Sequence, residues 1–131
     1  MGLSVLGAYA ALLAVWTACL GLRVANLRKH HQIGMGERDN RELAVAIRVH
    51  ANAVENVPIT LLLMLLLALQ GLGAVWMHLA GATLLLARVS HAWGMTVSGG
   101  RYSPYRVAGI TLNWVLILVL AMACLLMPWL A

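Results

Sequence analysis

Three long stretches of the chain carry no charged residue. Residues 3–22, residues 57–87 and residues 107–131 contain no Asp, Glu, Lys or Arg. A helix of about 20 apolar residues spans the ~30 Å hydrocarbon core of a bilayer. The pattern therefore predicts membrane-spanning helices.

The middle stretch must contain more than one helix. As a single helix, residues 57–87 would be about 46 Å long, which exceeds the thickness of the core. The break falls at residues 70–73, where Gly71 and Gly73 favour a tight turn. Residues 57–69 alone would reach only about 20 Å, so this span must begin near residue 42.

These lengths predict an all-α fold, an integral membrane four-helix bundle that forms a single domain over residues 1–131. The expected spans are about residues 3–25, 42–69, 74–96 and 105–129. Composition agrees, because 63% of the 131 residues are hydrophobic and only 10% are charged. A soluble domain of this size could not bury so much apolar surface.

The basic residues are explained by topology better than by nucleic-acid binding. The net charge is +5, but Lys and Arg form no long run. They concentrate in residues 23–41 and 88–106, and basic loops stay on the cytoplasmic side. Four spans place both basic segments there, whereas three would place one outside. We expect loops 26–41 and 97–104 to be cytoplasmic and both termini outside, and we expect no nucleic-acid partner.

The second span carries a polar stripe. Arg48, Asn52 and Glu55 fall within about 60° of one another on a helix. A charge at bilayer depth must be paired or face a water-filled cavity, so this face should point into the protein. Arg48 and Glu55 are two turns apart, which we expect to be too far for a direct bond, with Asn52 able to bridge them. The stripe is either a clamp between helices or a site for a zwitterionic ligand, because guanidinium binds carboxylate and carboxylate binds ammonium.

The other polar residues of the spans indicate their roles less clearly than the stripe does. Arg88 and His91 lie on one face of the third span, where Arg88 either snorkels to the headgroups or lines a pocket. Asn113 should pack or hydrogen-bond between helices. Cys19 and Cys124 have no zinc-ligand spacing, so we expect no metal site and no disulfide.

The stretch AIRVHANAVENVP at residues 46–58 resembles the signature of the MAPEG family, membrane-associated proteins in eicosanoid and glutathione metabolism. That signature is R-x-x-x-N-x-x-E followed shortly by Pro on the second of four helices. Residues 33–36 and 87–94 also resemble bacterial members, so the likeness covers nearly the whole chain in the same span order.

The resemblance implies a homotrimer that binds glutathione, as co-substrate, between adjacent subunits near the cytoplasmic side. Carried over by motif, Arg48, Asn52 and Glu55 would hold the tripeptide. The other positions that the resemblance assigns to the ligand are Arg28 at the end of the first helix, His91 and the catalytic Arg101.

Arg101 resembles the arginine proposed to stabilise the glutathione thiolate. A thiol has a pKa near 8.5, and an adjacent guanidinium lowers it and raises the nucleophilic thiolate. Tyr102 or Tyr105 could supply a hydroxyl instead. Met95 departs from the pattern, since some members have a second tyrosine there.

The resemblance therefore implies a detoxifying glutathione transferase or peroxidase of the bacterial inner membrane, whose lipophilic substrates arrive from the bilayer. A non-catalytic scaffold that binds glutathione or lipid is the alternative from another class. A small proton-coupled exporter using Glu55 is a third, although Arg48 on the same face would repel a cationic substrate.

Overall fold

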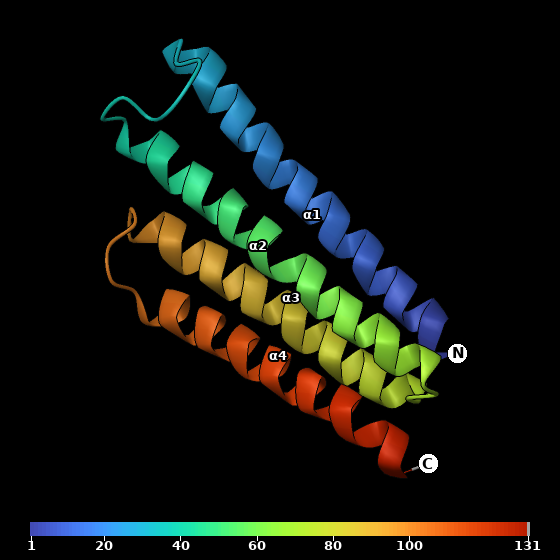
Figure 1. The fold of residues 1–131 in the computed structure, drawn as a ribbon. Helices are drawn as coiled ribbons and strands as arrows, with labels where there is room; N and C mark the ends of the chain where they lie inside the picture. Colours follow the sequence, from blue (N-terminus) through green and yellow to red (C-terminus); the bar gives the residue numbers. More distant parts are fainter. Residues whose placement is uncertain (131) are drawn as a thin grey trace.

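The computed structural model describes residues 1–130 as four antiparallel α-helices joined by short connections (Figure 1). The helices are α1 (Gly2–His31), α2 (Arg41–Leu69), α3 (Ala74–Val97) and α4 (Pro104–Leu130). The prediction of an all-α four-helix fold is confirmed. The first helix is longer than the span expected for it, since α1 continues to His31 rather than ending near residue 25.

The helices are long enough to cross a bilayer, with 24 to 30 residues each, or about 36 to 45 Å. Three of them, α1, α2 and α4, are also apolar enough to do so by composition. The third helix, which carries Arg88 and two histidines, contacts all three other helices. Arg88 and His91 are enclosed by these neighbours, whereas His78 is exposed.

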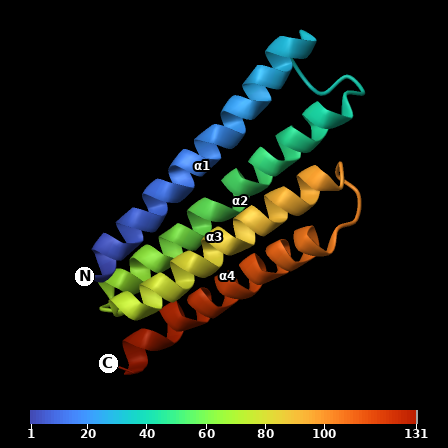
Figure 2. The same ribbon diagram turned by 180° about the vertical axis from the view of Figure 1, so that it is seen from behind.

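The bundle is built around the α2–α3 pair. Among the described residues α1 and α4 make no contact with each other, and they lie on opposite sides of that pair (Figures 1 and 2). Leucine and methionine side chains fill the space between the helices, including the fully buried Leu13, Met64, Met77 and Leu84. Both termini and the turn at residues 70–73 lie at one end of the bundle.

The opposite end holds the two longer loops and is fastened by arginines. Arg41 Nε donates to the Gly99 carbonyl at 2.7 Å, and Arg106 Nη1 donates to the Gly100 carbonyl at 3.2 Å. Arg23 Nη1 donates to Thr96 Oγ1 at 3.3 Å. Gly99 and Gly100 have φ of 60° and 81°, a conformation that favours glycine. The loop before α4 is thus held by side chains from α2 and α4, and the end of α3 beside it is held by a side chain from α1.

Asn40 and Pro104 set the starts of two helices at this end. The Asn40 side chain accepts a hydrogen bond from the Leu43 amide at 2.9 Å, which caps α2. Pro104 occupies the first position of α4, where its missing N–H is not needed. These local signals fix the register of the polar residues on α2 and α4.

We predict that Gly109→Ala will destabilise the bundle. A Cβ on Gly109 would lie 2.5 Å from the His91 backbone nitrogen and 2.6 Å from the Ala87 carbonyl oxygen. Because both atoms belong to the backbone, α3 and α4 must separate, at an expected cost of about 1 to 3 kcal/mol. The measurement is the thermal unfolding midpoint of the detergent-purified protein.

Gly7→Ala is the matched control, because a Cβ there would have no atom within 4 Å. Alanine favours helix over glycine, so its midpoint should stay level or rise slightly. Equal midpoints for the two variants would contradict this description of the α3–α4 contact.

Candidate functional site

A buried arginine lies where three helices meet near the loop end of the bundle. The Arg88 side chain on α3 is only 1% exposed. Its Nη1 donates to Asn52 Oδ1 on α2 at 2.7 Å, and its Nη2 donates to the Gly109 carbonyl on α4 at 3.5 Å. The guanidinium therefore joins α2, α3 and α4, and the interpretation that Arg88 snorkels to the headgroups is wrong.

The charge of Arg88 has no acidic partner in the described part of the chain. The one ion pair found among residues 1–130 joins Arg48 and Glu55, and the Arg88 Nε atom is buried without a hydrogen-bond partner. An unpaired buried charge is costly, so the polar groups around Arg88 matter for the stability of the bundle.

A chain of amides extends this polar centre along α2 and α4. Asn113 Nδ2 donates to Asn56 Oδ1 at 3.3 Å, and Asn56 Nδ2 donates to the Asn52 carbonyl at 2.9 Å. Asn113 is fully buried, and its Oδ1 has no partner among the described residues. The prediction that Asn113 hydrogen-bonds between helices is confirmed.

The outer part of the polar stripe is an ion pair. Arg48 Nη1 lies 3.8 Å from Glu55 Oε1, with the two side chains 58% and 54% exposed. The prediction that these residues are too far apart for a direct contact is wrong, because two long side chains on one face extend toward each other along the helix. Asn52 does not bridge them, since its oxygen is bonded to Arg88.

The exposure of Arg48 and Glu55 matters because both residues lie far along α2 from its first residue. Arg48 and Glu55 follow the first residue of α2 by seven and fourteen positions, or about 10 and 21 Å along the helix axis. A charged side chain facing lipid at such depth costs a few kcal/mol or more. The face that carries Arg48 and Glu55 therefore requires a cover other than lipid.

His91 and Arg106 belong to the same region. His91 is 5% exposed, one turn beyond Arg88 on α3, and its backbone packs against Gly109 of α4. Arg106 is half-buried in the first turn of α4. Sequence reasoning did not select Arg106, although its spacing from Gly109 and Asn113 places all three on one helix face and could have indicated it.

Four other predicted residues lie outside this cluster in the single chain. Arg28 Nη1 donates to the carbonyls of Gly36 at 2.9 Å and Ile33 at 3.4 Å, so it fastens the α1–α2 loop. The other three are exposed at the loop end, with Tyr102 81% and Tyr105 61% exposed beside Arg101. The structure thus brings together Arg48, Asn52, Glu55 and His91 of the predicted set.

Metal-ligating residues do not cluster within residues 1–130. No group of three or more His, Cys, Asp or Glu side chains there could hold a metal ion, and Cys19 and Cys124 are both free thiols. The polar atoms of the cluster are instead guanidinium, amide and carboxylate groups, which suit an organic ligand with charged ends.

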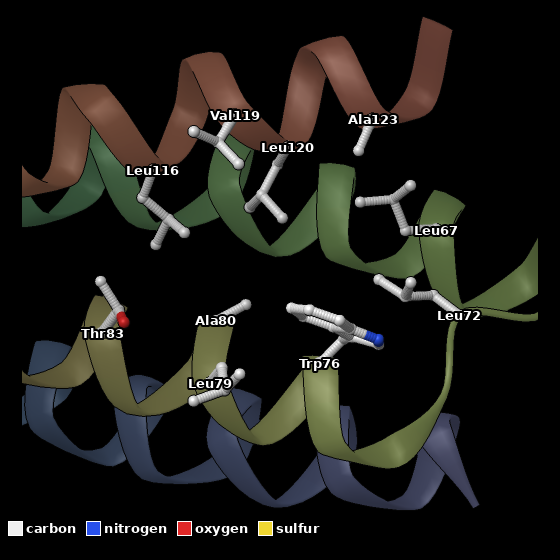
Figure 3. Close-up of a pocket in the computed structure, with 10 residues that line it drawn as sticks. All are labelled: Leu67, Leu72, Trp76, Leu79, Ala80, Thr83, Leu116, Val119, Leu120 and Ala123. Atoms are coloured by element: carbon white, nitrogen blue, oxygen red, sulfur yellow. The ribbon is translucent and has the colours of Figure 1, made fainter. Parts of the chain in front are cut away.

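Two apolar grooves lie along the helices. One, of about 380 Å³, runs between α1 and α2, where Val54 and Pro58 form part of its wall. The other, of about 370 Å³, lies between α2, α3 and α4 toward the termini. There Leu116 and Leu120 of α4 point toward Ala80 and Trp76 of α3 (Figure 3). Neither groove is lined by Arg48, Asn52 or Glu55, and the second lies in the half of the bundle near the termini.

A family sequence model and two individual relatives match most of this chain. The sequence model of the MAPEG family matches residues 6–126. Inner membrane protein YecN of Escherichia coli K12 is 34% identical to this chain over 122 residues, which is 92% of this chain and 91% of the relative. The protein of the same name from Escherichia coli O6:H1 shows the same identity and coverage.

We predict that Arg28→Ala will loosen the α1–α2 loop. The change removes both hydrogen bonds to the loop carbonyls, each worth about 1 kcal/mol. Cleavage after Glu37 by a glutamate-specific protease should therefore become about three- to tenfold faster. Lys29→Ala is the control, because the exposed side chain of Lys29, next to Arg28, makes no hydrogen bond to the described residues of the loop. Equal cleavage rates in the two variants would show that Arg28 does not hold the loop.

Proposed function

The chain belongs to the MAPEG family, and we propose that it is a membrane glutathione transferase or peroxidase. The observation that carries this proposal is the polar stripe on α2, where Arg48 and Glu55 remain exposed at membrane depth beside Asn52. Glutathione has two carboxylates, an ammonium and a thiol. Arg48 and Asn52 supply donors for a carboxylate, and Glu55 supplies an acceptor for the ammonium.

We propose that a second copy of this chain covers the stripe and completes the site. Lipid cannot solvate the Arg48–Glu55 pair, so a protein surface or an aqueous cavity must face it. The family resemblance sets the number of copies in this proposal at three. Arg101, Tyr102 and Tyr105 are exposed at the loop end of each copy, where they are free to contact a ligand held by a neighbour.

In the proposed reaction an arginine at the loop end stabilises the glutathione thiolate. The thiolate sulfur forms a bond to an electrophilic carbon of a lipophilic substrate, and the leaving group departs with the bonding pair. With a hydroperoxide, the sulfur attacks the terminal oxygen, the O–O bond breaks and the alcohol leaves after protonation. A second glutathione then reduces the sulfenic acid to give the disulfide and water. The groove between α1 and α2, at the level of Glu55 along α2, is our candidate entrance for the lipophilic substrate.

Two arginines are candidates for the thiolate contact. The family resemblance gives the role to Arg101, which is exposed on the loop before α4. Arg106 is the candidate that the geometry favours, because it is half-buried in the first turn of α4, one turn before Gly109, whose carbonyl binds Arg88. The experiment below tests both Arg101 and Arg106.

We also propose that all four helices cross the bacterial inner membrane. All nine Lys and Arg residues lie in the half of the bundle that contains the loops. Basic segments stay in the cytoplasm, so this half should face the cytoplasm and both termini the other side. The name of the relative, an inner membrane protein, supports this location.

A non-catalytic scaffold of the same fold is the second candidate function. It is favoured by the exposure of Arg101, Tyr102 and Tyr105, which in the single chain lie apart from the polar cluster. A proton-coupled exporter is disfavoured, because Glu55 is already paired with Arg48.

The test is an ultraviolet difference titration of the detergent-purified protein with glutathione near neutral pH. We predict a saturable thiolate band. Loss of the activating arginine removes a charge-assisted hydrogen bond of about 1.5 to 3 kcal/mol, so conjugation should slow by about ten- to a hundredfold. Arg106→Ala should remove the band if Arg106 makes the contact, and Arg101→Ala should do so if Arg101 makes it.

Arg38→Ala is the charge-matched control, because Arg38 is exposed on the α1–α2 loop. It should leave the band unchanged. Glutathione binding without any thiolate band would support the scaffold function. If neither binding nor the band is observed, the stripe acts only as a clamp between helices.

A further inference from the structure

The hydrogen bond between Arg88 and Asn52 fixes which way the Asn52 amide points. A guanidinium carries only donors, so the Asn52 atom that lies 2.7 Å from Arg88 Nη1 must be the oxygen. The amide nitrogen then lies on the other side of the group. No hydrogen bond from Asn52 Nδ2 to another of the described residues is found, so its two N–H donors remain available.

Arg88 has little freedom to release this oxygen. Its side chain is 1% exposed and is also held by the Gly109 carbonyl on α4. The backbone of Asn52 is braced as well, because its carbonyl accepts from Asn56 Nδ2, and Asn56 in turn accepts from the buried Asn113. The side-chain oxygen of Asn52 and its backbone carbonyl are thus both held before any ligand arrives.

This orientation gives each polar group of the stripe one role. Asn52 lies four residues after Arg48 and three before Glu55 on the same face. With its oxygen turned toward the buried Arg88, Asn52 presents its N–H donors on the other side of the amide. Glu55 is then the main acceptor that the stripe offers to a ligand, while Arg48 and Asn52 form a pair of donors.

We propose that Arg88 is a positioning residue that makes Asn52 a donor, so that Arg48 and Asn52 bind a carboxylate of the ligand. The specificity follows, since a ligand without a free carboxylate leaves both donors unmatched. This inference rests on the proposed glutathione site, and the experiment below separates failure of the inference from failure of the site.

The decisive variant is Asn52→Asp, which has the same shape. Its carboxylate still accepts from Arg88 but cannot donate to a ligand, and it repels a ligand carboxylate. Calorimetric titrations should show glutathione affinity at least tenfold weaker. The affinity for glutathione diethyl ester, in which both carboxylates are blocked, should change much less. Asn26→Asp, the same change at an exposed position of α1, should leave both affinities unchanged.

The Arg88 variants test positioning against a purely structural role. Arg88→Lys keeps a charged donor and should retain part of the preference for glutathione over the diester. Arg88→Met frees the amide to rotate and should abolish that preference. A purely structural role predicts equal losses for both ligands in both variants, and that result would overturn the proposal. Glutathione binding by Asn52→Asp as tight as that of the unmodified protein would do the same.

Thermal unfolding tests the orientation of the Asn52 amide without any ligand. The carboxylate introduced by Asn52→Asp would give the buried guanidinium a charged partner, so the unfolding midpoint of this variant should equal or exceed that of the unmodified protein. Asn52→Leu should lower the midpoint, because it removes the acceptor. If the unmodified protein binds no glutathione, the proposed function fails while this comparison still decides the orientation. Equal lowering of the unfolding midpoint by Asn52→Asp and Asn52→Leu would overturn the proposed orientation of the amide.

Discussion

The buried charge of Arg88 is the constraint on which the loop-end half of the bundle depends. A guanidinium that is 1% exposed cannot be left without acceptors, and the two that it has come from α2 and α4. Gly109 supplies one of them, and its lack of a side chain allows α4 to approach the backbone of α3 at His91. The close α3–α4 packing and the position of Asn52 thus follow from the same requirement.

The same constraint links the interior to the surface. Asn52 faces Arg88 with its oxygen, while Arg48 and Glu55 on the same helix face form an ion pair that is more than half exposed. The half of the bundle near the termini contains no Lys or Arg, and its groove is lined by apolar side chains and Thr83. Polar and apolar groups are therefore separated along the axis of the bundle, which suits the proposed reaction of a charged thiol with a lipophilic partner.

The sequence was sufficient for the fold class and for the residues of the stripe. Uncharged stretches and the glycine turn predicted four helices, because hydrophobic length is set by the bilayer. The register of Arg48, Asn52 and Glu55 followed from helical periodicity alone. Other features depend on how helices pack against one another, which periodicity does not report. The enclosure of Arg88 between α2 and α4 is one, and the half-buried place of Arg106 is another.

The length of the two side chains explains why the expected separation of Arg48 and Glu55 was wrong. Residues two turns apart on a helix are separated by about 10 Å along its axis, which excludes contact for short side chains. Arg48 and Glu55 are long enough to lie 3.8 Å apart at their ends. The role of Arg28 also depended on the loop conformation, since the carbonyls that it binds belong to a segment without regular structure.

The central claim is that the stripe on α2 binds glutathione only when another copy of the chain covers it. Native mass spectrometry of the detergent-purified protein with added glutathione tests this directly, because it reports subunit number and ligand number in one spectrum. We predict that glutathione will be found on assemblies of three chains and will be absent from single chains. Glutathione on single chains, or three-chain assemblies that never carry it, would contradict the account.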